Sequence, residues 1–137
     1  MRNQSMTLTL IILYVVTAMV FLLLDAIMLT LVMKPLFTSH IGSMMETDMR
    51  LGAAAVFYLA YVAGLVFLIG WPALKTGAPV LLPAAVLGAM AYGTYEFTSY
   101  AIMKNWSPVM VATDVVWGTV LTAVSAWAGV TVARLWA

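Results

Sequence analysis

Residues 7–33 read TLTLIILYVVTAMVFLLLDAIMLTLVM, and Asp25 is the one charged residue among them. A helix needs about 20 predominantly apolar residues to cross the hydrocarbon core of a bilayer, so this stretch is long enough to span it. A secretory signal would have a shorter apolar stretch followed by a cleavage site with small residues, and neither is found here. We therefore predict a retained membrane-spanning helix at 7–33, which Pro35 ends by removing a backbone donor.

Three further apolar stretches follow, at about 51–72, 80–103 and 108–133. The second ends at Trp71 and Pro72, and an aromatic residue is typical of a membrane interface. The fourth is preceded by Ser107, which suits a helix cap, and starts at Pro108, which suits the first helical position. The joins between the last three stretches are short, so these helices are expected to be antiparallel neighbours. The sequence predicts an all-α membrane protein, a four-transmembrane-helix antiparallel bundle in which 1–137 form a single domain.

The composition agrees with a membrane protein and excludes several other classes. The chain has 137 residues, of which 65% are hydrophobic and 8% charged, whereas soluble domains have about 25% charged residues. Its net charge of +1 comes from scattered residues without a basic block, so we expect membrane lipids as partners and no nucleic acid. The absence of cysteine excludes disulfides and thiolate ligands, and we expect neither a cofactor nor a metal site.

The segment 34–50 is the only long connection, and it can form a short surface helix. Methionines 44, 45 and 49 lie near His40 and can offer soft ligands to copper. Their spacing specifies no site, however, and methionine commonly fills apolar gaps, so we expect His40 to be a solvated loop residue. The lysines and arginines are equally divided between the two membrane sides, with Arg2, Lys75 and Arg134 on one and Lys34, Arg50 and Lys104 on the other. The acidic residues of the segment favour cytoplasmic termini, although acids contribute little to this rule.

Three carboxylates lie inside the predicted spans: Asp25, Glu96 and Asp114. Each costs about 2.5–3.5 kcal/mol to place in the membrane, so each requires a partner or a purpose. Antiparallel threading puts all three on the side of the segment 34–50, about 5–10 Å from the midplane at a rise of 1.5 Å per residue. Tyr58 and Tyr61, early in the second span, reach the same level. The sequence thus predicts one polar layer to which every helix contributes.

Helical spacing places further polar groups near these acids. Tyr92, Glu96 and Tyr100 follow at four-residue steps and therefore share one face of the third helix. Asp114 is followed by Trp117 one turn later on the fourth. We predict a convergent pocket in which the acids hold charge, tyrosines line the pocket or donate hydrogen bonds, and Trp117 forms a wall. Its members are Asp25, Glu96, Asp114, Tyr58, Tyr61, Tyr92, Tyr100 and Trp117.

Small residues at four-residue spacing permit close helix packing. They occur at Ala60 and Gly64 in the second span, and at Ala84, Gly88, Ala85, Ala89 and Gly93 in the third. They can pack this bundle, and one such face can also receive a second copy of the chain, so a homo-oligomer is expected.

The pocket favours a protein that binds or translocates a proton, a cation or a small polar ligand. One alternative is an enzyme acting on a lipid or isoprenoid, with one carboxyl group as general acid and another as base. Another is an accessory membrane subunit without a ligand. The acids can also be purely structural, either protonated and hydrogen-bonded or paired with Lys34, Arg50 and Lys104.

Four short motifs resemble a known family over nearly the whole chain. They are Leu24-Asp25-Ala26, Phe57-Tyr58 with Tyr61-Val62-Ala63-Gly64, Ala91-Tyr92-Gly93-Thr94-Tyr95-Glu96, and Asp114-Val115-Val116-Trp117-Gly118-Thr119-Val120-Leu121. On these residues the chain resembles the bacterial membrane proteins catalogued as domain of unknown function 2177. It departs from the expected pattern at Glu96, where an aspartate is expected, and at Met28, where a tryptophan is expected. The resemblance implies a small bacterial inner-membrane protein and no established activity.

Overall fold

The computed structural model describes residues 3–46 and 50–136, and every regular element in these ranges is helical. The prediction of an all-α protein is therefore confirmed for this part of the chain. Arg2 and Met49, and also Asp48, which is one of the acidic residues of the segment 34–50, lie outside the described residues. The helices are α1 Asn3–Met28, α2 Lys34–Ile41, α3 Leu51–Leu65, α4 Trp71–Thr76, α5 Leu81–Ile102 and α6 Pro108–Ala133. Short 3-10 turns follow at Gly42–Met44 and Arg134–Trp136.

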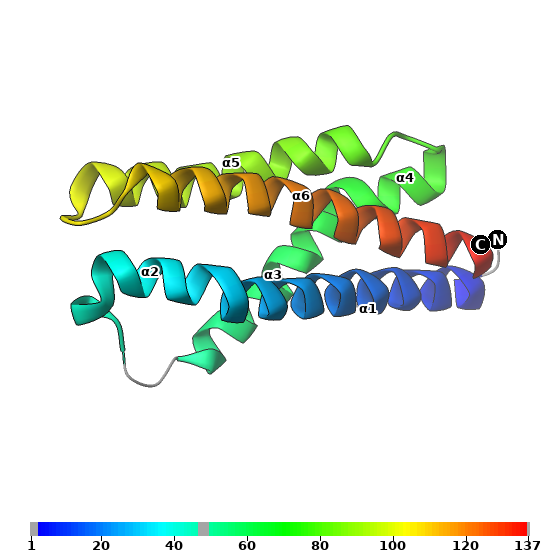
Figure 1. Cartoon of the computed structure of the whole chain (residues 1–137). Helices are drawn as coiled ribbons and strands as arrows, with labels where there is room; N and C mark the ends of the chain where they lie inside the picture. The colour runs from blue at the N-terminus through cyan, green and yellow to red at the C-terminus, as the bar shows by residue number, and fades with distance from the viewer. Residues whose placement is uncertain (1–2, 47–49, 137) are drawn as a thin grey trace.

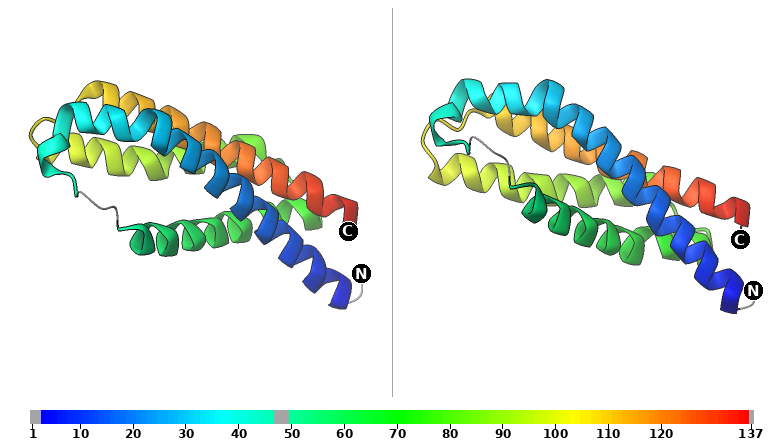
Figure 2. Two further views of the ribbon diagram at one scale, coloured as in Figure 1. Left: turned by 60° about the horizontal axis from the view of Figure 1, so that its bottom comes forward. Right: turned by 90° about the horizontal axis from the view of Figure 1, so that it is seen from below.

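The helices run up and down the molecule in chain order (Figure 1). The beginning of α1 and the end of α6 lie at one end, whereas the end of α2 and the connection from α5 to α6 lie at the other. Figure 2 shows that the beginning of α3 is set apart from α2, although the two are close in sequence. In agreement with this, residues 51–61 at the beginning of α3 are all exposed or half-buried.

The prediction that Pro35 and Pro72 end helices is wrong. The chain stays helical through both prolines because a π-helical turn precedes each, at Leu29–Met33 and at Val66–Gly70. In both turns, the residue just before the proline donates its N–H to the carbonyl five residues earlier. A proline ring collides with the carbonyl four residues back in an α-helix, and the wider turn relieves this collision. The segment after Pro35 thus continues the first helix, which changes direction between α1 and α2 (Figure 2).

Three helical stretches among the described residues are long and apolar enough to cross a membrane: Met6–Met44, Leu51–Thr76 and Pro108–Trp136. Helix α5, which carries Glu96, is not among them. The structure therefore supports a membrane protein with several apolar helices.

Helices α5 and α6 pack closely against each other through glycines. A side chain at Gly88 would meet the backbone oxygen of Gly118 and the side chain of Thr122. Ala84, one turn earlier on the same face, is fully buried. The Ala84 and Gly88 face thus packs inside a single chain. On α3, Ala60 is exposed, and association with a second copy stays a prediction.

At the end of the molecule where α5 connects to α6, α2 packs on the beginning of α6 through a small apolar cluster that contains Ile41 and Trp106. The predicted cap is confirmed, since the Ser107 hydroxyl accepts a hydrogen bond from the Met110 N–H at 3.2 Å. The interpretation of His40 as a loop residue is wrong: it lies on α2, and its Nδ1 is 3.0 Å from the carbonyl oxygen of Leu36.

Candidate functional site

A cavity of about 500 Å³ lies between the first helix and helices α3, α5 and α6. Its volume is in the range of small-molecule sites, about 300–1,000 Å³. The lining is mostly apolar and aromatic. Its polar side chains are Asp25, Lys34, Tyr58, Tyr61, Tyr92, Tyr95 and Asp114.

Asp25 is the acid that α1 contributes to the cavity, and it is nearly buried. The indole N–H of Trp117, on α6, donates a hydrogen bond to its Oδ1 at 3.1 Å. Tyr58 interacts electrostatically with the same carboxyl group from α3. The carboxyl group of Asp25 is therefore held by a neutral donor and faces a phenol.

Asp114 and Glu96 form the second acidic part of the site. Asp114 lines the cavity, whereas Glu96 does not line it and is 0% exposed. The two side chains interact with one another, and Asp114 also interacts electrostatically with Asp25. The indole N–H of Trp106 donates a hydrogen bond to Glu96 Oε1 at 3.0 Å. Glu96 Oε2, also buried, has no hydrogen-bond partner in the described part of the chain.

Aromatic rings build the rest of the cavity wall. The Phe21 ring lies behind Tyr58 and Tyr61, with ring centroids 5.6 and 5.5 Å away. Tyr61 in turn lies edge-on to Tyr92 at 6.3 Å, and its hydroxyl is 2.9 Å from the Thr122 hydroxyl. The ring positions are thus fixed by mutual packing and by a hydrogen bond to α6.

The structure brings most of the predicted site residues to one level of the molecule. Five of them line the cavity: Asp25, Asp114, Tyr58, Tyr61 and Tyr92. Glu96 lies behind Asp114, and Trp117 holds Asp25 without lining the cavity. Tyr100 does not line the cavity and is 48% exposed. The shared-face argument for Tyr100 therefore does not place it at the site.

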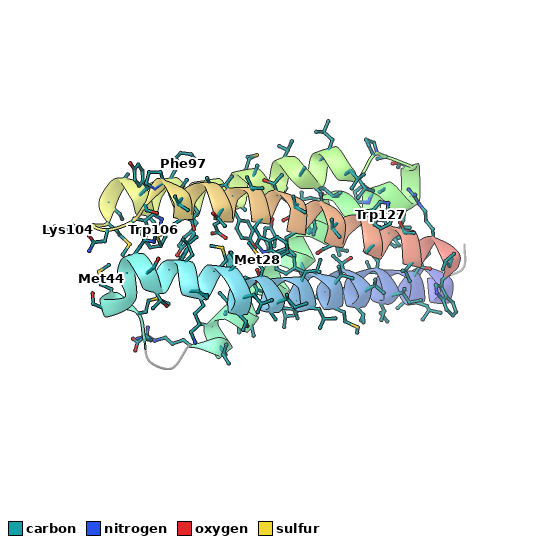
Figure 3. The ribbon with its side chains drawn as sticks, in the orientation of Figure 1. Met28, Met44, Phe97, Lys104, Trp106 and Trp127 are labelled. Atoms are coloured by element: carbon teal, nitrogen blue, oxygen red, sulfur yellow. The ribbon has the colours of Figure 1, made fainter. Side chains whose placement is uncertain are left out.

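Three contributors were missed from the sequence: Lys34, Tyr95 and Trp106. Trp106 is buried between Phe37 and Tyr95, with ring centroids 5.1 and 5.8 Å away. Figure 3 shows Trp106 between α2 and the paired helices α5 and α6, with Lys104 farther out at the same end. The adjacency of Tyr95 to Glu96 in the sequence was the one available signal for this group.

The buried acids have no ionic partner among residues 3–46 and 50–136. The ion pair found there joins Arg50 to Glu46 at 2.8 Å on the exposed surface. In the same ranges, no three acidic, histidine or cysteine side chains are grouped so that they could hold a metal ion. The carboxyl groups therefore meet indole N–H groups and phenols rather than cationic side chains.

The family model described as "Predicted membrane protein (DUF2177)" matches residues 10–131. Neither a curated protein nor a solved structure matches the chain.

Proposed function

The chain belongs to this family of predicted membrane proteins, and from that premise we propose that its cavity binds or translocates a proton, a cation or a small polar ligand. The observation that carries the proposal is the pair Asp25 and Asp114. Both are buried, both line one cavity, and neither is paired with a base in the described residues.

A cation is the ligand that best complements this site. A carboxylate in a poorly hydrated bundle is costly unless charge nearby compensates it. The indole N–H of Trp117 stabilises the Asp25 carboxylate but adds no positive charge. Aromatic faces also attract cations, and the cavity wall is rich in tyrosine and phenylalanine. A substituted ammonium ion, with charge at the acids and an apolar body against the rings, satisfies both parts of the lining.

The cavity is accessible from the side of the bundle. Two aromatic residues that line it, Phe57 on α3 and Tyr95 on α5, are 60% and 52% exposed. Lys34 lies on the lining at the start of α2 and is exposed. An amphiphilic cation can therefore enter between α3 and its neighbours while its apolar part stays in contact with lipid.

Helix α5 is proposed as a fourth membrane span, and the membrane is proposed to be a bacterial inner membrane. Its 22 residues correspond to about 33 Å, enough for a hydrocarbon core of about 30 Å. Its exposed side carries Leu82, Val86, Met90 and Phe97, and Figure 3 shows Phe97 pointing outward. Glu96, which lowers the hydropathy of the helix, is buried. The charged group of α5 thus faces the bundle, while the side exposed to lipid carries these apolar side chains together with Tyr95 and Tyr100.

Binding of benzyltrimethylammonium to the protein in lipid nanodiscs tests the proposal, because this probe joins a fixed positive charge to one aromatic ring. We expect saturable binding in calorimetry. Binding should be at least about thirtyfold weaker for Asp114→Asn and Asp25→Asn, since a lost buried charge contact costs about 2–5 kcal/mol. Glu46→Gln, which removes an exposed acid, is the matched control and should bind like wild type. Equal affinity of all four proteins, or no saturable binding by wild type, contradicts the proposal.

A further inference from the structure

We propose that Glu96 and Asp114 hold one proton between them and that a cation entering the cavity displaces it, so that the site exchanges a proton for a cation. This inference rests on the proposed function. It gives a role to Glu96, which lies outside the cavity lining.

The geometry of Glu96 requires a hydrogen that no neighbouring group supplies. Its side chain is 0% exposed, Oε1 accepts from the Trp106 indole, and Oε2 has no partner in the described residues. Tyr92 on α5 lies against Gly118 on α6. Glu96 is one turn beyond Tyr92 and Asp114 is one turn before Gly118, so in this antiparallel pair of helices the two carboxyl groups lie opposite each other and interact. Two carboxylates can only accept hydrogen bonds, whereas a carboxylic acid also donates one. A single proton therefore turns a repulsive pair into a hydrogen-bonded pair.

Among the described residues around Glu96 and Asp114, no side chain brings a positive charge to the pair. Asp25 faces Asp114 from α1, Tyr58 faces it from α3, and Tyr92 and Tyr95 face the acids from α5. Lys34 lines the cavity from α2 but forms no ion pair with the acids. The tyrosines are neutral donors and Asp25 is a further acid. Compensating positive charge must then come from a proton or from a bound cation.

The exchange conserves charge within the site. With one proton, the Glu96 and Asp114 pair carries a charge of −1. A cation that contacts Asp114 favours ionisation of both carboxyl groups, and the proton that leaves carries away the same charge that the cation brings. The cation thus takes the place of the proton as the positive charge beside Asp114, and the net charge of the site stays the same.

Proton release on binding of benzyltrimethylammonium in weakly buffered nanodiscs tests the inference, because this probe has no proton of its own to lose. For wild type we expect one proton released per cation bound. The affinity should then rise about tenfold per pH unit for as long as the pair holds its proton before the cation binds. In Glu96→Gln, the amide donates a hydrogen bond to Asp114 in place of the proton. This variant should bind the probe with nearly constant affinity and release no proton.

Tyr100→Phe, an exposed change on the same helix, is the matched control and should release a proton like wild type. Binding by wild type without proton release overturns the exchange and leaves the cation site standing, whereas absence of binding overturns both. An infrared measurement on wild type needs no variant: the band of a protonated carboxyl should disappear when the probe is added. A band that persists at saturation also overturns the exchange.

Discussion

Replacing Gly88 by alanine is predicted to destabilise the contact between α5 and α6. The added methyl group would meet the backbone oxygen of Gly118 and the side chain of Thr122. The backbone oxygen is part of α6 and cannot turn away, so the two helices must separate. At Gly93, on the same helix, an added methyl group meets nothing within 4 Å.

The pair of variants isolates the packing term. Overpacking a closely packed site costs about 1–3 kcal/mol, whereas alanine in place of glycine favours a helix by about 0.8–1 kcal/mol. The second term is common to Gly88→Ala and Gly93→Ala and cancels in their difference. Gly93→Ala should therefore be more stable than Gly88→Ala by about 1–3 kcal/mol, which is about fivefold to a hundredfold in the unfolding equilibrium.

The measurement is reversible unfolding in mild detergent with a rising fraction of dodecyl sulfate, followed by tryptophan fluorescence. Trp106 is buried and Trp117 is hydrogen-bonded to Asp25, so both report loss of packing. Coincidence of the fluorescence and circular dichroism transitions supports the two-state treatment. Equal stability of the two variants, or a more stable Gly88→Ala, would show that the helices do not meet at Gly88.

Two further predictions concern the indole support of Glu96 and the membrane topology. Trp106→Phe removes the donor to Glu96 and should lower the free energy of unfolding by about 1–3 kcal/mol. Trp127→Phe, at a half-exposed position, should change the free energy of unfolding by less than about 0.5 kcal/mol. Equal losses in the two variants would show that the hydrogen bond to Glu96 does not stabilise the fold. Because the chain contains no cysteine, Lys75→Cys and Lys104→Cys each give one thiol, and an impermeant maleimide should label them from opposite faces if α5 spans the membrane. Labelling of both from the same face would exclude that span.

The depth of the site could be inferred from the sequence because depth follows from helix direction and rise alone. Antiparallel threading places Asp25 late in one helix and Asp114 early in another, and the structure has them at one cavity. The donors to these acids could not be inferred. The contact of Trp117 with Asp25 joins residues 92 positions apart. Which side chains meet depends on the rotation of each helix about its axis, and the apolar pattern does not determine this rotation. Trp106 reaches Glu96 through the turn between α5 and α6, whose path no spacing rule specifies.

The face of α5 was only partly predictable for a related reason. Four-residue spacing groups Tyr92, Glu96 and Tyr100, but a shared face produces a site only where another helix covers it. The wall at this level includes Tyr95 rather than Tyr100. The prolines were misjudged because their cost assumes α-helical geometry. A π-helical turn avoids that cost, and the sequence contains no separate mark for it.

The hydrogen-bond partners of the buried acids are neutral side chains, although two lysines lie on the same side of the bundle. Lys34 and Lys104 are on the same side of the bundle as the acids, and an ion pair with either would neutralise a carboxylate permanently. The structure instead gives Asp25 and Glu96 one indole donor each. A neutral donor lowers the cost of burying a carboxylate without cancelling its charge. The negative charge at the cavity therefore stays available to a proton or a cation, as a binding site requires and as a purely structural ion pair would not allow.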